Sequence, residues 1–470
     1  MSDPLWTAKQ ALAATGGELT RDIDWTCNGV SIDTRSICPG DLFVALTDIR
    51  DGHEFVPDAM ARGASAALVE RSAGLPGSHL KVSDSLDALR ALGAAARDRS
   101  SAIRVAVTGS VGKTSVKEAL AAVFRAAGPA HWSVKSYNNH WGVPLTLARM
   151  PADTERAVFE MGMNHAGEIR DLSSLVQPHV TLITRIGEAH LENLGSIEAI
   201  ADAKSEIFEG MEPDGVAIIP ADDPLGERIA QHARNSSAAF LLEFGRASHA
   251  AVRIEEFETG LDGSRGRINV MGNRVPFRLA ASGEHWAWNT AAVFAAAAAT
   301  GLDARDVADA LAEVDAAAGR GRAVKISLPG GGEATLLDDA YNANPVSMRA
   351  AMSSLAAARP EGEGRRIAVL GDMLELGASG PALHAELAEP LLSANTDLVF
   401  SCGSLMKHLH DALPAPLRAG YAKSASEVLE PLKSELRSGD VVLMKGSNGS
   451  GLHKIAAVLA DGTAFDLTEA

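Results

Sequence analysis

One segment of the chain constrains its fold more than any other. The β-branched apolar run 103–107 is typical of a buried strand, and the alanine-rich run 114–127 is typical of a helix that ends before Gly128 and Pro129. Between them lies a loop with two glycines, Thr108-Gly109-Ser110-Val111-Gly112-Lys113-Thr114. A strand that passes through a glycine loop straight into a helix predicts a parallel βαβ arrangement.

This loop has the properties of a phosphate-binding loop, and its seven residues are predicted to bind ATP. Glycines let backbone N–H groups approach phosphate oxygens, and a helix N-terminus carries a partial positive charge. Lys113 is expected to neutralise the β- and γ-phosphates, and the Thr114 hydroxyl to bind Mg²⁺. Val107 stands where the full pattern has a glycine, so the loop is a variant. The alternative is a glycine-rich turn with an exposed lysine.

The chain divides into three α/β blocks, in line with the two to four domains expected for 470 residues. Residues 1–100 contain short β-like runs and close with a helix. Residues 101–318 alternate strands and helices, which predicts a parallel sheet. Residues 319–470 repeat this alternation and predict a second, smaller parallel sheet of the Rossmann type.

The expected elements follow from apolar runs and turn residues. The strands are expected at 40–46, 66–70, 103–107, 157–160, 180–184, 334–337, 367–370, 398–401 and 441–444, and the helices at 86–99, 114–127, 346–358 and 382–392. The glycine run 330–332 predicts a hairpin or loop. The alanine-rich run 286–300 is shorter than the ~20 residues of a membrane span, so a buried helix is expected there.

Composition narrows the class of protein. A net charge of −17 argues against non-specific binding to nucleic acid and against docking on an anionic membrane. Three cysteines, Cys27, Cys38 and Cys402, are too few for a disulfide framework. Polar residues interrupt the N-terminal region, so no signal peptide is expected. We expect a cytoplasmic protein, a monomer, with no nucleic-acid or membrane partner.

Further motifs follow the loop in order along the chain. They are Asn138-Asn139 with 142–147 (GVPLTL), 160–165 (EMGMNH), 186–192 (IGEAHLE) and 203–208 (AKSEIF). Together with the T-G-x-x-G-K-T loop, these stretches resemble the Mur ligase family. The stretches 33–46 (DTRSICPGDLFVAL), 338–345 (DDAYNANP) and 369–377 (VLGDMLELG) extend the resemblance over nearly the whole chain.

The resemblance implies an α/β fold of three domains: an N-terminal uridine-nucleotide domain, a central ATPase domain of the phosphate-loop type, and a C-terminal Rossmann-like domain that binds the amine substrate. It implies an ATP- and Mg²⁺-dependent ligase that phosphorylates a carboxylate and lets an amine attack the acyl phosphate. The stretches 338–345 and 369–377 favour UDP-N-acetylmuramoyl-tripeptide and D-alanyl-D-alanine as substrates, for peptidoglycan synthesis.

The family motifs assign roles to matching positions. The catalytic residues would be Lys113, Glu160, His190 and Lys204, and the Mg²⁺ ligands would be Thr114, Glu160, His190 and Lys204. Lys204 would carry a CO₂-derived carbamate. ATP would also contact Asn289, Arg320 and Asp339, and the other substrates would contact Asp33, Thr34, Arg35, Asn138, Asn139, Tyr341 and Asn344.

Simpler explanations for some of these residues stay open. Lys204 could be a surface lysine, and Asp33 with Arg35 could be a surface ion pair of little energetic consequence. Asn138 and Asn139 could cap a loop. A domain hinge is expected near 318–321.

The chain also departs from the family pattern. Arg185 stands where an asparagine is common, and Trp286 replaces the first asparagine of G-x-H-N-x-x-N. Trp286 and Trp288 are expected to be packing residues. Asn448 replaces the arginine of K-G-S-R, which bears on recognition of the amine substrate.

Other functions remain compatible with parts of the sequence. The tripeptide-forming Mur ligase and folylpolyglutamate synthetase share the chemistry, and the N-terminal block disfavours the latter. A nucleotide-binding regulator that hydrolyses ATP without ligation would explain the loop, but not Glu160, His190 and Lys204 in ordered motifs. A scaffold with no catalysis would explain none of these motifs.

Overall fold

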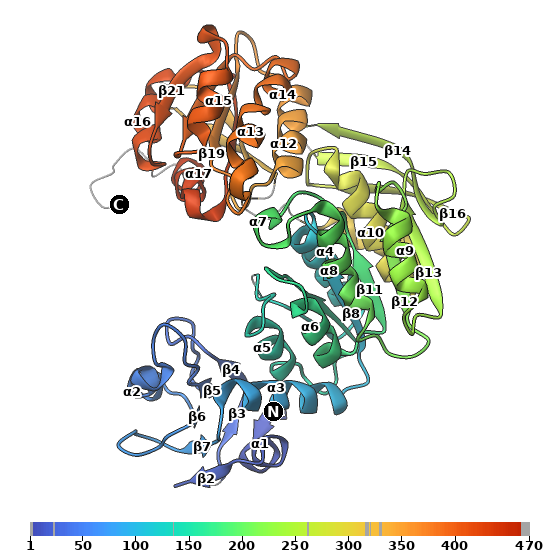
Figure 1. Ribbon diagram of the computed structural model, residues 1–470, viewed down its shortest axis with the longest axis vertical. Coiled ribbons are helices and arrows are strands. Elements are labelled where there is room, and N and C mark those ends of the chain that lie inside the picture. Colours follow the sequence, from blue (N-terminus) through green and yellow to red (C-terminus); the bar gives the residue numbers. More distant parts are fainter. Residues whose placement is uncertain are drawn as a thin grey trace.

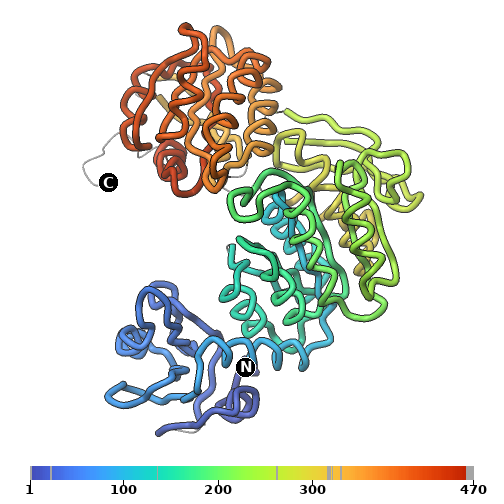
Figure 2. The backbone as a smooth tube through the Cα atoms, in the orientation of Figure 1, coloured from blue at the N-terminus to red at the C-terminus, as the bar shows by residue number. Residues whose placement is uncertain are grey.

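The computed structural model describes residues 3–21, 24–134, 136–260, 263–314, 319, 321–328 and 331–461. Three α/β bodies follow one another along the long axis, with the N-terminal body at the bottom of Figure 1 and the C-terminal body at the top. The continuous tube in Figure 2 runs through them in chain order. This is the three-body α/β architecture that the sequence predicts, whereas the boundaries after 100 and 318 stay a prediction.

The N-terminal body is built on a five-stranded sheet in the order β2-β7-β6-β5-β4. The runs expected at 40–46 and 66–70 form β5 (Asp41–Val44) and β6 (Ala66–Val69), and the expected helix is α3 (Ser85–Asp98). The sequence did not predict the short strands β1 (Trp6–Thr7), β2 (Glu18–Thr20), β3 (Thr26–Cys27), β4 (Gly29–Ser31) and β7 (His79–Lys81). Helices α1 (Ala8–Thr15) and α2 (Val56–Ala61) complete the body.

The middle body contains nine strands in the order β16-β15-β14-β13-β12-β11-β8-β10-β9. Within this sheet the run β14-β13-β12-β11-β8-β10-β9 is parallel. At the other end, β14, β15 and β16 form an antiparallel meander that the sequence did not predict. The bounds are β8 (Ile103–Thr108), β9 (Ala130–Trp132), β10 (Arg156–Glu160), β11 (Val180–Ile183), β12 (Val216–Pro220), β13 (Phe240–Gly245), β14 (Val252–Gly260), β15 (Gly263–Val270) and β16 (Asn273–Leu279).

Helices cover both faces of the middle sheet, which explains why its central strands are continuous apolar runs. Alternate residues of β8 point to opposite faces: Val105 and Val107 pack with α4 (Lys113–Ala127), α10 (His285–Ala299) and α11 (Ala304–Ala312). Ala106 packs on the other face. That face is covered by the helices α5 (Gly142–Ala148), α6 (Glu168–Val176), α8 (Ile197–Ser205) and α9 (Gly226–Arg234). The alanine-rich run is the buried helix α10, as predicted.

The C-terminal body has six strands in the order β17-β18-β22-β19-β20-β21, and its last strand, β22, lies inside the sheet. Five strands are parallel, and four of them were predicted; the sequence did not predict β21 or the antiparallel edge strand β17. The bounds are β17 (Arg322–Ser327), β18 (Glu333–Asp338), β19 (Arg366–Gly371), β20 (Leu398–Cys402), β21 (Arg418–Ala422) and β22 (Val441–Lys445). The glycine run 330–332 lies between β17 and β18, and its first residue is outside the described ranges.

The helices of the C-terminal body cover both faces of its sheet. They are α12 (Pro345–Ala357), α13 (Gly380–Ala385), α14 (Ala388–Ser393), α15 (Met406–Ala412), α16 (Ser426–Glu435) and α17 (Leu452–Ala460). The single helix expected at 382–392 is wrong, because this stretch forms the two short helices α13 and α14. Pro390 lacks the backbone N–H that a continuous helix would bond to the carbonyl of Glu386.

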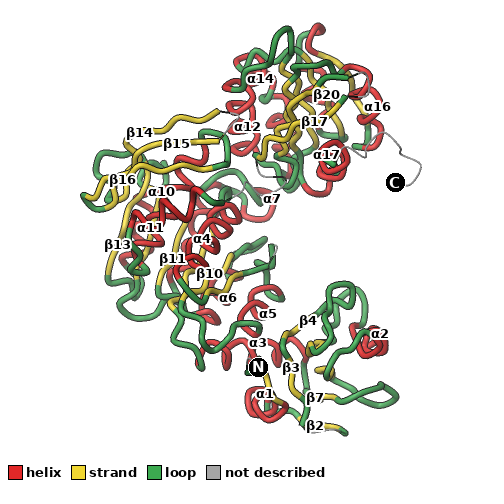
Figure 3. Tube along the Cα trace, turned by 180° about the vertical axis from the view of Figure 1, so that it is seen from behind, coloured by secondary structure: helices red, strands yellow, loops and turns green. Residues whose placement is uncertain are grey.

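The view from behind shows α12 and the short helix α7 (Leu191–Leu194) at the junction between the middle and C-terminal bodies (Figure 3). The carboxyl ends of β8, β10 and β11 lie at one edge of the middle sheet, because adjacent parallel strands share their direction. Among the described residues, no helix has both the length and the apolar character needed to cross a membrane.

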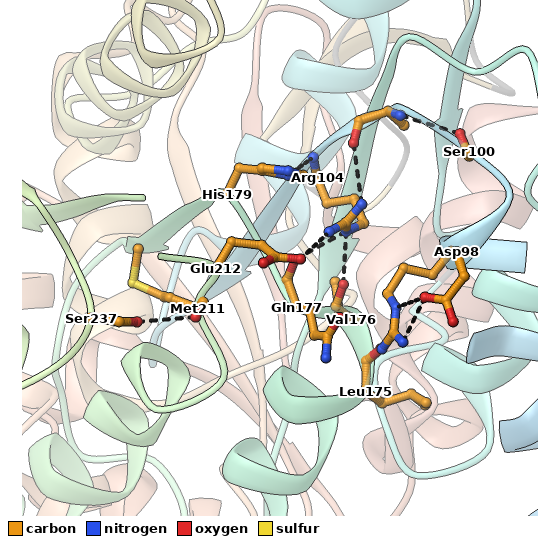
Figure 4. A network of polar contacts seen from close by, with 12 residues as sticks. Asp98, Ser100, Arg104, Leu175, Val176, Gln177, His179, Met211, Glu212 and Ser237 are labelled. Carbon is orange, nitrogen blue, oxygen red and sulfur yellow. Dashed lines mark hydrogen bonds and ion pairs between the residues drawn. The ribbon is translucent and has the colours of Figure 1, made fainter. Parts of the chain in front are cut away.

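Arg104, near the start of β8, forms hydrogen bonds to neighbouring segments at the opposite, amino-terminal edge of the middle sheet (Figure 4). Its guanidinium donates to the carbonyls of Val176 at 2.9 Å and Gln177 at 3.0 Å, and to Oε1 of Glu212 at 2.9 Å. Its backbone N–H donates to Nδ1 of His179 at 3.1 Å. This buried arginine therefore joins β8 to the end of α6, the start of β11 and the turn before β12.

Replacing Arg104 with alanine should lower the free energy of unfolding by about 3 kcal/mol, because several buried acceptors lose their donor. Urea unfolding followed by circular dichroism measures this. The control is Arg265→Ala, since Arg265 forms an ion pair with Glu258 in which the two side chains are 73% and 71% exposed. Such a surface pair is worth at most about 1 kcal/mol. Equal losses in the two variants would contradict the structural role of Arg104.

Candidate active site

The glycine loop has the shape that its sequence predicts, and close contacts require a glycine at both of its glycine positions. Gly109 has φ +147° and Gly112 has φ +86°, both in the region that favours glycine. A β-carbon on Gly109 would lie 2.0 Å from Oγ1 of Thr184, and one on Gly112 would lie 2.5 Å from Oδ1 of Asn289. The loop is therefore packed against the segment after β11 and against α10.

Side-chain hydrogen bonds hold the loop in this shape. The Thr184 hydroxyl lies 2.6 Å from the carbonyl oxygen of Val111 and 3.2 Å from that of Thr108. The Ser110 hydroxyl donates to the carbonyl of Gly187 at 2.9 Å. Lys113 Nζ donates to the carbonyl of Gly109 at 2.6 Å, so its ammonium lies over the loop itself. A phosphate chain held by the loop N–H groups would meet this ammonium.

Glu160 ends β10, the strand beside β8. Its side chain is buried, and Oε1 accepts from Nδ2 of Asn138 at 2.8 Å. The other oxygen, Oε2, is buried and has no hydrogen-bond partner. An unpartnered buried carboxylate oxygen that shares a cavity with the buried Thr114 fits a hard cation such as Mg²⁺, which prefers oxygen ligands. Within the described ranges, no three His, Cys, Asp or Glu side chains group closely enough to hold a metal.

A cavity of ≈ 690 Å³ opens in front of the loop, and its walls come from both the middle and the C-terminal bodies. It brings together eleven of the predicted site residues: Ser110, Val111, Gly112, Lys113, Thr114, Asn138, Glu160, Asn289, Asp339, Tyr341 and Asn344. Polar contacts join the two bodies across it. The hydroxyls of Ser136 and Tyr341 are 2.7 Å apart, and Asn344 Nδ2 donates to the carbonyl of Ser110 at 3.4 Å.

His190 and Lys204 do not line this cavity, but they lie near Lys113. Lys204 is 1% exposed, and burial lowers the pKa of its ammonium well below the usual range, with the neighbouring Lys113 lowering it further. Burial also lowers the pKa of His190, and Glu375 opposes that shift. Nδ1 of His190 lies 2.6 Å from Oε2 of Glu375 in the C-terminal body, close enough to pair electrostatically but without hydrogen-bond alignment.

The N-terminal candidates lie away from the cavity. Arg35 pairs with Asp33 at 2.7 Å, with the arginine side chain 87% exposed, so the two form a surface ion pair in this structure. The Thr34 hydroxyl bonds to Asp58. Asn139 also stays outside the cavity, because its Oδ1 accepts from the backbone N–H of Gly142 at 2.9 Å, at the start of α5. The loop-capping interpretation therefore describes Asn139, whereas Asn138 lines the cavity.

Three further candidate positions are Arg320, Arg185 and Asn448. Arg320 lies outside the described residues, and so does residue 318, so only residues 319 and 321 of the expected hinge at 318–321 are described. Arg185 and Asn448, which depart from the family pattern, both line the cavity.

The sequence interpretation missed several cavity residues, among them Ser136, Thr184, Trp288 and Lys445. Lys445 Nζ donates to Oδ2 of Asp339 at 2.8 Å and to the carbonyl of Asn342 at 2.9 Å, so it braces the ends of two strands. Trp288 packs against the core, as expected, and it also lines the cavity. Trp286 is 6% exposed and packs in the core, as predicted.

Comparison with known proteins identifies the family. Residues 107–297 match the Mur ligase middle domain, and residues 319–448 match the Mur ligase glutamate ligase domain. The UDP-N-acetylmuramoyl-tripeptide–D-alanyl-D-alanine ligase of Rickettsia prowazekii is 32% identical over 453 residues, which cover 96% of this chain and 99% of that protein. The chain therefore belongs to the Mur ligase family.

Solved structures show the same architecture. A crystal structure of MurF from Acinetobacter baumannii superposes with a TM-score of 0.84 at 30% identity and covers 98% of this chain and 99% of its own. A MurF ligase from Thermotoga maritima in complex with ADP shares the fold with a TM-score of 0.77 at 24% identity, over 92% of this chain and 97% of its own. The three-body arrangement is thus that of the family.

Replacing Lys204 with methionine should stabilise the protein in CO₂-free buffer, and the gain should shrink as the pH rises. Below the folded-state pKa of Lys204, burying the charged ammonium has its full cost. Between the folded- and unfolded-state pKa values the unfolded chain binds more protons, so the wild type gains about 1.4 kcal/mol per pH unit relative to the variant. Unfolding in urea between pH 6 and about 10 measures the difference.

The matched control is Lys9→Met, because Lys9 is exposed on α1. Its effect should stay within about 0.5 kcal/mol at every pH. A Lys204→Met difference that does not change with pH would mean that Lys204 is not a desolvated amine.

Proposed function

We propose that the protein is an ATP-dependent ligase that adds D-alanyl-D-alanine to UDP-N-acetylmuramoyl-tripeptide, forming the pentapeptide precursor of peptidoglycan with ADP and phosphate. One observation carries the proposal: a single cavity between two bodies combines a phosphate loop, the unpartnered oxygen of Glu160 and polar residues of the C-terminal body. The names of its relatives support these substrates. The reaction uses ATP and a uridine nucleotide, so we assign it to the cytoplasm.

The chain's own residues would hold ATP as follows. The N–H groups of the loop and the ammonium of Lys113 bind the phosphates, and Asp339 with Asn289 binds the nucleoside. Thr114 and Glu160 would hold Mg²⁺, with His190 and Lys204 as further candidates. When bound, Mg²⁺ supplies positive charge that offsets the negative charge of the transferring phosphoryl group.

A carboxylate oxygen is a poor leaving group, so an amide cannot form from it directly. The tripeptide carboxylate attacks the γ-phosphorus, the bond to the β-phosphate oxygen breaks, and ADP leaves. The amine of the dipeptide then attacks the acyl carbon, loses a proton, and expels phosphate. Asn138 and Ser136, which line the cavity, would contact the acceptor, and Tyr341 and Asn344 would close the cavity from the C-terminal body. Closure excludes water that would hydrolyse the acyl phosphate.

Lys204 fits the role of a carbamylated lysine. Carbamate formation requires a neutral amine, and burial lowers the pKa of this amine well below its usual range. Reaction of the neutral Nζ amine with CO₂ forms an N–C bond and releases one proton, so the buried side chain becomes an anion. The resulting anion would be stabilised by the neighbouring Lys113, whereas the ammonium is destabilised by it.

The function is tested by phosphate release with Mg²⁺, ATP and UDP-N-acetylmuramoyl-tripeptide, with and without D-alanyl-D-alanine. Release should require the dipeptide, and mass spectrometry should find the pentapeptide product. Lys113→Ala should lower kcat by at least about 100-fold, because charge stabilisation of the phosphoryl group is lost. The exposed-site control Lys9→Ala should stay within about twofold of the wild type. Release that ignores the dipeptide would count against the proposal.

The carbamate is tested separately with ¹³C-labelled bicarbonate. The wild type should show one carbamate carbon resonance that exchanges with added CO₂ and disappears at acidic pH, where the carbamate decomposes. Lys204→Arg should lack the signal, because a guanidinium stays protonated in proteins. A resonance that persists in Lys204→Arg would assign the modification to another amine.

A further inference from the structure

Trp288 occupies an unusual position on the cavity wall. It lies in the first turn of α10, and its indole Nε1 donates to Oδ2 of Asp222 at 3.1 Å, which fixes the edge of the ring. The guanidinium carbon of Arg246 lies 4.9 Å from the ring centre, and Arg246 is in turn paired with Glu284. The backbone N–H of Arg246 also donates to Oδ2 of Asp222 at 2.6 Å. The indole is therefore held rigidly while part of it faces the cavity.

The neighbouring residue adds a polar group to the same wall. Asn289 is 7% exposed, and its Nδ2 is buried without a hydrogen-bond partner although the side chain lines the cavity. Its Oδ1 lies against Gly112 of the phosphate loop. A buried amide donor with no partner is costly, so a ligand acceptor at this point would offset that cost.

Helix α12 of the C-terminal body also lines the cavity, through Val346, Ser347, Arg349, Ala350 and Ser353. Figure 1 shows α10 in the middle body and α12 in the C-terminal body, on the two sides of their junction. An aromatic ring from α10, a helix across the junction and an unpartnered donor beside the phosphate loop line one cavity, and together they match a flat heterocycle attached to a phosphate chain.

Arg185 lies close to Trp288 in the cavity wall. It lines the cavity, and its guanidinium carbon lies 5.5 Å from the centre of the Trp288 ring. Within the described ranges no carboxylate pairs with it, whereas Arg246 on the same ring is paired with Glu284. Its planar cation is thus available to a bound group. A guanidinium stacks on aromatic rings and also binds phosphate oxygens.

We propose that Trp288, fixed by Asp222 and Arg246, is the stacking platform for the base of the nucleotide, and that Arg185 completes this platform. The proposal rests on the proposed function, in that the nucleotide is ATP. Asn289 Nδ2 donates to a ring nitrogen of the base, and α12 covers the other face. Trp288 is thereby a binding residue, and this chain uses an aromatic side chain where its sequence suggested only packing.

The test compares binding of Mg²⁺–ADP and of tripolyphosphate, which has no base, by calorimetry. Stacking of a base on an aromatic side chain predicts that Trp288→Ala weakens ADP binding about 10- to 100-fold, and that Trp288→Phe recovers most of it. Tripolyphosphate should bind to the wild type and to Trp288→Ala within about twofold of each other. In steady-state assays Trp288→Ala should raise the KM for ATP and leave kcat within about threefold.

A fluorescence control uses Trp286, which packs in the core. ADP should quench the emission of Trp286→Phe, in which Trp288 remains, and should lose this quench in Trp288→Phe. Equal ADP affinity in the wild type and Trp288→Ala would overturn the platform while leaving the ligase proposal intact. An equal loss for ADP and tripolyphosphate would also overturn it, because the residue would then act through the fold. A wild type that binds neither ligand would overturn the proposed function itself.

Discussion

The meeting of the carboxyl ends of β8, β10 and β11 at one edge of the middle sheet is the constraint on which the candidate site depends. Parallel pairing places the glycine loop after β8, Glu160 at the end of β10 and Thr184 after β11 side by side. The Thr184 hydroxyl then bonds to two carbonyl groups of the loop. The loop's shape is therefore set by strand register as much as by its glycines, which is why a phosphate site can form without the first glycine of the usual pattern.

The C-terminal body supplies the remaining residues of the candidate site. Asp339, Tyr341 and Asn344 follow β18, whose carboxyl end faces the cavity, and Lys445 at the end of β22 holds Asp339 in place. Contacts of Tyr341 with Ser136 and of Asn344 with Ser110 span the junction. Two parallel sheets thus face each other with their carboxyl edges, each the usual place for ligands in an open α/β sheet. A reaction between two substrates suits such a junction, since each body can carry one of them.

Local sequence patterns predicted the elements that depend on local forces. The segment 103–127 was placed to within a residue, because a β-branched run, two glycines and an alanine-rich helix act over short distances. The strands β14, β15 and β16 and the edge strand β17 were missed although each pairs with a neighbour along the chain. Charged residues such as Arg253, Glu255 and Arg267 interrupt the apolar runs by which strands were recognised.

The candidate site was predictable where motifs follow strand ends. It was not predictable where the direction of a side chain decides whether that residue lines the cavity. Asn138 and Asn139 are adjacent, yet only Asn138 lines the cavity, because Asn139 caps α5. Trp288 and Trp286 both read as packing residues, but helical geometry separates them by about 200° around α10, so one faces the core and the other the cavity. No signal in the sequence distinguishes the two members of either pair.

The central claim is that the cavity activates a carboxylate by phosphoryl transfer before an amine attacks it. The most direct measurement labels both oxygens of the terminal tripeptide carboxylate with ¹⁸O and follows the label during turnover with ATP and D-alanyl-D-alanine. The account predicts that each phosphate released carries one ¹⁸O and that the new amide keeps the other. Pentapeptide formed with unlabelled phosphate would show that the carboxylate was not phosphorylated, and would contradict the account.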